Sequence, residues 1–339
     1  MSAIDAQLTS KSLTAQPEPA VGVAHWLENF PVTLFGSVMG IIGLGIAGMR
    51  FEQILQISIG GAGHTVLYIG TAWFVFLTMV YLLKAARYPH KVREEFAHPV
   101  RVNFFPAYSI SLLLLSIGFL EINPQLSRIL WWVGAPLQLF YTLKILSTWL
   151  TRDDLKLAHL NPAWFIPVVG TILVPIAGVK HAHPEISWLF FSAGLIFWIV
   201  LFSLMVNRLI FAPSLPKKLL PTLFILIAPP AIGFVAYIKL GGGYDMFARV
   251  LFYFGVFTFL LLLTMLPRFR DLPFFVSWWA FTFPLDALTI SVLLMYKLSG
   301  LEIYRHAALV LLPLTAAVIA MVTLHTLKAA VARKICVAE

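Results

Sequence analysis

Charged side chains are scarce in this sequence of 339 residues. Lys, Arg, Asp and Glu together make up 12% of the chain, whereas 60% of its residues are hydrophobic. Soluble domains carry about 25% charged residues, and a chain of this length could not hide so much apolar surface in a soluble core. The composition therefore predicts an integral membrane protein.

Cysteine and catalytic residue sets are lacking as well. The single Cys336 excludes an intrachain disulfide. The histidines lie in loops or near the ends of apolar runs, which argues against a haem bundle. No phosphate-binding glycine loop and no intramembrane catalytic set is present. We therefore expect no cofactor, no metal site and no enzymatic activity.

The net charge of +9 has to be explained, because it could indicate a nucleic-acid-binding protein. The basic residues form no patch but lie between apolar runs, as the positive-inside rule predicts. Of the 24 Lys and Arg residues, 17 fall on the side that holds both termini. We therefore expect no nucleic acid partner, and a multi-pass protein of the plasma (inner) membrane with both termini in the cytoplasm.

What the sequence has in abundance is apolar runs long enough to span a bilayer, which requires about 20 residues of helix. Ten runs qualify, and the alternation typical of a β-barrel is absent. We expect an all-α domain over 30–328, with a largely disordered N-terminal tail (1–29) and a C-terminal tail (329–339). The expected spans are 30–48, 65–86, 101–120, 126–149, 163–179, 185–211, 219–239, 247–266, 274–296 and 303–328.

Proline and glycine separate the odd spans from the even ones. Proline removes a backbone donor and kinks a helix, so the freed carbonyl groups need protein or water partners within a membrane. The pattern predicts that odd spans form an inner ring that lines a pore, although Pro and Gly are common in membrane helices generally. The residues predicted to line this pore are Gly36, Gly40, Pro106, Pro167, Pro229 and Pro284.

Two ionisable residues are candidates for a role in a solute path. Asp286 lies near the middle of the ninth span, where a carboxylate costs about 2.5–3.5 kcal/mol on insertion scales. It is either a proton or cation site, or a residue that hydrogen-bonds to a neighbouring inner helix. Arg101, at the start of the third span, either concentrates anions at a cytoplasmic mouth or only marks the cytoplasmic side.

Four stretches, in the same order along the chain, resemble the tellurite-resistance/C4-dicarboxylate transporter family, which includes plant slow-type anion channels. They are FPVTLFGSVMG (30–40), EEFAHPVRVNFFPAYSI (94–110), WLFFSAGLIFWI (188–199) and WWAFTFPLDALT (278–289). The resemblance implies five helical hairpins around a central pore, a homotrimer, and closure of the pore by Phe283. Asp286 departs from the plant pattern, which has a small or hydroxyl residue there.

The function expected from this resemblance is an anion channel that passes small inorganic or organic anions through a pore gated by Phe283. The alternative is a proton-coupled transporter of dicarboxylate, sulfite or tellurite-type oxyanions, in which Asp286 would carry the proton. Besides these anions, the expected partners are the lipid bilayer and further copies of the chain.

Overall fold

The computed structural model describes residues 23–337. These residues form helices and connecting turns, and no strand occurs among them. Within this part of the chain, ten segments are long and apolar enough to cross a membrane. The prediction of an all-helical membrane protein with ten spans is confirmed.

Each odd span begins with a 3-10 helix that continues into an α-helix, and this 3-10 helix is longest in the seventh span, where η5 has 11 residues. Three-residue turns are tighter than α-helical turns and usually form short pieces at helix ends. In α5 and α9 the change from 3-10 helix to α-helix coincides with a proline in the first α-helical turn. Proline is favoured at this position, because the N–H that it lacks would have no partner within the α-helix. The pairs are η1 Val32–Leu34 with α2 Phe35–Leu55, η2 Arg101–Phe104 with α5 Pro106–Phe119, η4 Pro162–Trp164 with α7 Phe165–His181, η5 Lys217–Ile227 with α9 Ala228–Lys239, and η6 Val276–Phe281 with α12 Thr282–Ser299.

The even spans are single long helices. Three of them begin at a side chain that accepts a hydrogen bond from the first helical turn: Asn123 from the N–H of Leu126, His183 from Glu185 and Asp245 from Ala248. The even spans are α3 Ala62–Arg87, α6 Pro124–Thr151, α8 Pro184–Phe211, α10 Met246–Thr264 and α13 Glu302–Val331. Short helices lie between or before the spans: α1 Val23–Glu28, α4 Pro89–Ala97, η3 Leu157–His159 and α11 Pro267–Arg270.

The predicted boundaries agree with the observed ones to within a few residues, except at the first span. This span was predicted to end at residue 48 but continues to Leu55. Polar residues in the additional part of the helix have partners: Arg50 forms an ion pair with Glu121 at 2.8 Å, and Glu52 accepts the N–H of Ile59 at 2.7 Å. A helix can extend past polar residues when other parts of the fold satisfy them.

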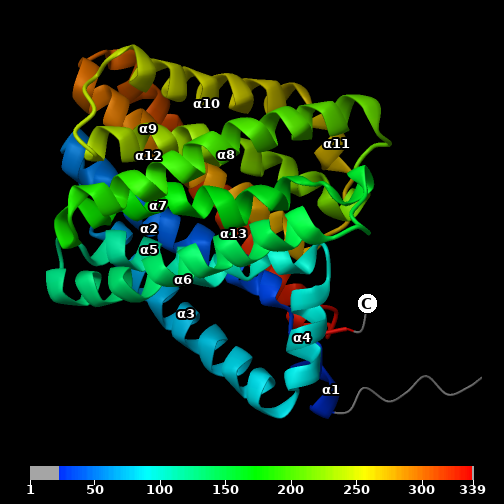
Figure 1. The fold of residues 1–339 in the computed structure, drawn as a ribbon. Coiled ribbons are helices and arrows are strands. Elements are labelled where there is room, and N and C mark those ends of the chain that lie inside the picture. Colours follow the sequence, from blue (N-terminus) through cyan, green and yellow to red (C-terminus); the bar gives the residue numbers. More distant parts are fainter. Residues whose placement is uncertain (1–22, 338–339) are drawn as a thin grey trace, which may run out of the picture.

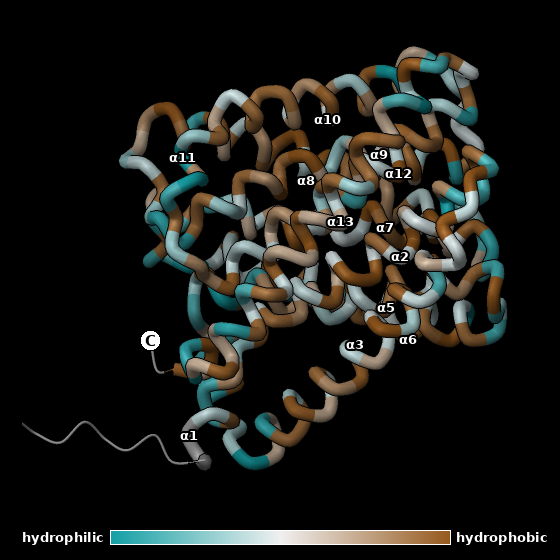
Figure 2. Tube along the Cα trace, turned by 180° about the vertical axis from the view of Figure 1, so that it is seen from behind, coloured by the Kyte–Doolittle hydropathy of each residue, from teal (hydrophilic) through white to brown (hydrophobic). Residues whose placement is uncertain are grey.

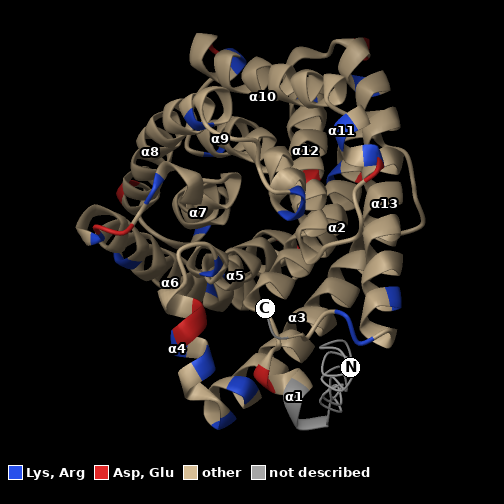
Figure 3. Cartoon of the chain, turned by 90° about the vertical axis from the view of Figure 1, so that its right-hand side faces the viewer, with Lys and Arg blue, Asp and Glu red and all other residues tan. Residues whose placement is uncertain are grey.

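The odd spans form the centre of the molecule. α2 contacts α5, α5 contacts α7, α7 contacts α9, α9 contacts α12, and α12 returns to α2, which closes a ring (Figure 3). Each even span packs against the odd span that precedes it. In the most apolar 18-residue stretch of each span, 72–89% of residues are buried in odd spans and 22–33% in even spans. We call the five odd spans the inner spans and the even ones the outer spans.

Buried hydroxyl groups on the inner spans have backbone partners. Every inner span carries a Ser or Thr whose hydroxyl donates to the carbonyl oxygen three residues earlier, which satisfies both groups in an apolar setting. The five residues are Ser37, Ser109, Thr171, Thr222 and Thr282. The repeat of the same local bond supports a repeated design around the ring.

The bundle has two ends, which we name the terminal end and the far end. The terminal end holds α1, α4, α11 and the last described residues, and the inner spans begin there (Figure 1). The far end holds the turns that follow each inner span. Hydrophobic residues run along the bundle and hydrophilic ones gather at both ends (Figure 2). Of the two predicted tails, 1–22 and 338–339 lie outside the described residues, and residues 23–28 of the first tail form α1.

Candidate functional site

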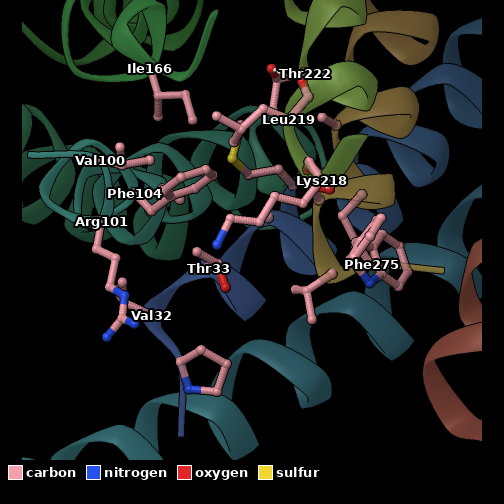
Figure 4. Close-up of a pocket in the computed structure, with 18 of the residues that line it drawn as sticks. Val32, Thr33, Val100, Arg101, Phe104, Ile166, Lys218, Leu219, Thr222 and Phe275 are labelled. Carbon is pink, nitrogen blue, oxygen red and sulfur yellow. Dashed lines mark hydrogen bonds between the residues drawn. The ribbon is translucent and has the colours of Figure 1, made fainter. Parts of the chain in front are cut away.

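A cavity of about 920 Å³ lies between the inner spans and reaches the terminal end. Each inner span turns one face toward it, with lining residues three or four positions apart, as a helical face requires. Figure 4 shows the wide part of this cavity, into which the side chains of Arg101 from η2 and Lys218 from η5 extend. All five inner spans thus contribute to one axial space.

The residues that line the cavity change in size along the axis. One small residue from each inner span lies in its wall: Gly36, Ala107, Gly170, Ala228 and Ala280. Beyond each small residue, three or four positions further along the span, the lining contains a larger apolar side chain. These five side chains, which we call the closing layer, are Met39, Ile110, Leu173, Ile232 and Phe283. Only Pro284, directly after Phe283, follows a member of this layer in the lining of its own span. All five are at most 9% exposed, so the cavity stops where large side chains replace small ones.

Basic residues outnumber acidic ones around the wide part of the cavity. The ionisable Lys, Arg and Glu side chains in its lining are Lys84, Lys91, Arg101, Lys218, Lys328, Lys334, Glu28, Glu94 and Glu95. Each glutamate is close to a lysine: Glu95 lies 2.9 Å from Lys84, and Lys91 lies 3.0 Å from Glu94 and 3.8 Å from Glu28. The balance leaves an excess of positive charge, which raises the local concentration of anions.

Lys84 is one of these lining residues, and its side chain is almost fully buried. Its ammonium group contacts Glu95 and donates to the carbonyl oxygen of Phe30 at 2.7 Å. The hydroxyl of Tyr81 donates to the same glutamate at 2.8 Å. The pair therefore fixes α3, α4 and the segment before η1 to one another, at the edge of the cavity.

Asp286 lies outside the cavity lining. It is fully buried, and neither of its carboxylate oxygens has a hydrogen-bond partner among residues 23–337. It lies against Gly43 of α2, where an added Cβ atom would lie 2.5 Å from Oδ2. Asp286 thus faces the contact between α12 and α2, whereas Phe283 of the same helix faces the axis.

The sequence profile of the SLAC1 family, described as voltage-dependent anion channel, matches residues 29–327. This range covers all ten spans except the last four residues of α13. The chain belongs to the SLAC1 family. The resemblance noted from four sequence stretches is confirmed by this match.

Relatives of this SLAC1-family chain occur in plants, archaea and bacteria. The S-type anion channel SLAH2 of Arabidopsis thaliana is 31% identical over 77% of this chain and 52% of its own length, so the chain spans about half of that relative. The uncharacterized transporter MJ0762 of Methanocaldococcus jannaschii is 29% identical over 83% of the chain and 89% of its own length. A tellurite resistance protein TehA homolog of Haemophilus influenzae is 25% identical over 81% and 84%.

The six residues predicted to line the pore divide into two groups in this SLAC1-family fold. Gly36 and Pro284 line the cavity, as do Arg101, predicted at the cytoplasmic mouth, and Phe283, predicted as the gate. The other four are not in its lining, and a role for them in a pore stays a prediction: Gly40, Pro106, Pro167 and Pro229. Proline position alone therefore does not identify the axial face.

Gly40 and Pro167, two of the residues outside the lining, contact neighbouring helices. A Cβ atom at Gly40 would collide with the hydroxyl of Thr282 on α12. The carbonyl oxygen of Pro167 accepts hydrogen bonds from Gln138 at 2.8 Å and Thr142 at 2.6 Å, both on α6. These contacts provide the protein partners that polar backbone needs within a membrane.

Four members of the closing layer were missed by sequence reasoning: Met39, Ile110, Leu173 and Ile232. They are ordinary apolar residues within apolar helices, so no contrast in polarity marks them. The small wall residue three or four positions before each one is the signal that could have found them. Reading it requires the five inner spans to be compared in register.

Proposed function

We propose that this protein is an anion channel whose conduction path runs along the axis of the five inner spans. The observation that carries the proposal is the shape of the axial cavity, which is wide and basic at the terminal end and stops at the closing layer. Anions collect in the wide part and pass when the closing layer opens. The membership of the family and the names of the plant relatives support anions as the solute.

Phe283 is the gate in this proposal. It carries the only aromatic side chain of the closing layer, whose other four members are Met39, Ile110, Leu173 and Ile232. A dry apolar constriction stops ions because an ion cannot leave its hydration shell there without replacement ligands. Movement of one ring would admit water and restore conduction.

The electrostatics of the path suit a channel. The five inner spans begin at the terminal end, so the positive ends of their helix dipoles lie around the wide part of the cavity. These partial charges attract anions without the tight binding that would trap them, and conduction requires weak binding. Arg101 and the other basic residues of the rim add to this field.

Reconstituted protein tests the proposal. In a planar bilayer with unequal chloride on the two sides, a channel gives a current whose reversal potential follows the anion gradient. The same measurement with nitrate and malate ranks the permeant anions. A current that is absent, or that follows the cation gradient, contradicts an anion channel.

A second candidate function is a proton-coupled transporter of oxyanions, and the environment of Asp286 favours it. A buried carboxylate without a hydrogen-bond partner is a costly arrangement for an ion, and proton uptake would remove the charge. In this case Asp286→Asn abolishes uptake driven by a pH gradient. In a channel, the same variant still conducts down the anion's electrochemical gradient.

We also propose that the terminal end faces the cytoplasm and that the protein is a homotrimer in the plasma membrane. The excess of Lys and Arg at the terminal end supports the orientation. A cysteine at Asp153 in a Cys336→Ser background should react with an impermeant maleimide only after cells are opened, whereas one at Gly243 should react in intact cells. Mass measurement of the protein in detergent tests the trimer.

A further inference from the structure

The far end of the inner spans carries its own set of charges. A charged residue lies near the C-terminal end of each inner α-helix. Lys180, Lys239 and Lys297 are in the last turn of α7, α9 and α12, Glu121 follows the end of α5, and Arg50 lies one turn before the last turn of α2. Because the five helices form a closed ring and run in the same direction, these residues surround the far end of the axis. Four are basic and one is acidic.

Contacts connect these residues across the ring. Arg50 of α2 and Glu121 after α5 form an ion pair at 2.8 Å, although they are 71 positions apart in the sequence. Lys239 of α9 interacts electrostatically with Arg50, Lys297, Glu121 and Lys180, which belong to the four other inner spans. The five charges therefore act on one common region.

Two ordinary explanations account for part of this arrangement. A cation at a helix C-terminus is favoured because it complements the helix dipole. The positive-inside rule, however, leaves few basic residues for the far end, and only seven of the 24 Lys and Arg residues are there. Three of those seven are in the last turns of inner helices, and Arg50 lies one turn earlier in α2. Without them, five negative dipole ends would surround the axis and repel an anion.

We propose that Arg50, Lys180, Lys239 and Lys297 form an anion-binding ring at the far end of the axis, and that Glu121 weakens it. The ligands are small anions, and dianions bind more strongly because the same potential acts on twice the charge. This inference rests on the proposed conduction of anions and adds a second binding station, opposite the basic cavity.

Glu121 sets the strength of the ring through its pairing with Arg50. The hydrogen bond from Arg50 holds the pKa of Glu121 below its ordinary value. Glu121 therefore remains ionised at neutral pH, and the five side chains carry three net positive charges. A weaker ring suits conduction, because an anion held too tightly would block the path.

The binding of chloride can be measured without conduction, from the line width of the chloride NMR signal in the presence of detergent-solubilised protein. The test variant is Lys180→Gln/Lys239→Gln/Lys297→Gln. The matched control is Arg249→Gln/Arg305→Gln, which removes basic residues of the same end that lie on the outer spans α10 and α13. Both variants are checked for an unchanged helix content and a single gel-filtration peak.

The expected effect follows from Coulomb's law with screening. A charge about 8 Å from the bound anion changes its affinity about twofold at roughly 10 mM ionic strength and less at 0.15 M. The triple variant should therefore lose about eightfold in far-end chloride affinity at low salt. The chloride affinity of the control should match that of the wild type, and Glu121→Gln should bind chloride about twofold more tightly. Sulfate should displace chloride from the wild type at a lower concentration than from the triple variant.

Equal chloride broadening in the wild type, the control and the triple variant would overturn the ring. If the triple variant fails to fold, Lys239→Gln alone should still give the twofold loss, and an unchanged affinity counts against the ring. The failure of the proposed function is a separate result, because it appears as wild-type liposomes without anion flux. The ring can be present in a protein that does not conduct, and the channel can exist without the ring.

Discussion

Replacement of Phe283 by Ala is the sharpest test of how the axial path is closed. Phe283 is 8% exposed and belongs to the closing layer, together with one aliphatic side chain from each of the other inner spans. Its truncation removes about 100 Å³ of side chain, room for about three water molecules at roughly 30 Å³ each. The closing layer then has space for a partly hydrated ion.

The size of the effect can be worked out from the hydrogen bonds of the anion. One water molecule that accompanies the anion through the constriction restores a hydrogen bond to a charged group, which contributes about 1.5–3 kcal/mol. A barrier lowered by that amount raises the rate about 10- to 100-fold. We therefore expect the flux through Phe283→Ala to exceed the wild-type flux by this factor, with Phe283→Leu in between.

The assay is chloride efflux from proteoliposomes, with a potassium ionophore to carry the compensating charge. Phe234→Ala is the matched control, because Phe234 is a fully buried phenylalanine of α9 that packs against Phe252 and is not in the cavity lining. It should lose about 3–5 kcal/mol of stability without any gain in flux. Wild-type or lower flux through folded, reconstituted Phe283→Ala protein would refute the gate.

Four further outcomes are expected. Asp286→Asn should leave the reversal potential of a chloride current unchanged, and loss of all flux together with its pH dependence would favour the transporter instead. Lys84→Met should lower the free energy of unfolding by about 3–5 kcal/mol because it leaves Glu95 buried and unpaired, and adding Glu95→Gln should recover part of that loss in thermal unfolding. Gly43→Ala should cost about 1–3 kcal/mol, because the new Cβ atom meets the carboxylate of Asp286, and a wild-type melting temperature would contradict this contact. Arg101→Gln should reduce anion flux about twofold at roughly 10 mM salt and less at 0.15 M, and an effect that does not depend on salt would exclude a purely electrostatic role.

Much of the fold could be predicted from the sequence because the bilayer imposes strict rules. A spanning helix must be apolar over about 20 residues, so ten spans can be counted without any knowledge of packing. Proline in the third, fifth, seventh and ninth spans pointed to the spans that the structure buries. The prediction failed at the end of the first span, where Arg50 and Glu52 find partners from other parts of the chain.

The axial face could not be predicted in the same way. An inner span of a membrane protein is apolar on every side, because one side packs against other helices and the other faces a dry constriction. Ile110 and Leu173 therefore look like lipid-facing residues in the sequence. The ion pair of Lys84 was hidden for a different reason: its partner Glu95 belongs to α4, and only the fold brings α4 back against α3.

The position of Phe283 within its helix bears on the proposed gate. It is the second residue of α12, which follows the 3-10 helix η6 directly, and it precedes Pro284. The N–H of Thr282 still donates to the carbonyl oxygen of Trp279 in η6, whereas Pro284 has no N–H to donate. Met39, Ile110 and Ile232 are each the fifth residue of their α-helix, and Leu173 is the ninth. Four closing side chains thus lie further inside regular α-helix, whereas the aromatic one lies where the 3-10 helix changes to α-helix. In the proposed gate, a shift of this boundary along the chain would rotate Phe283 away from the axis.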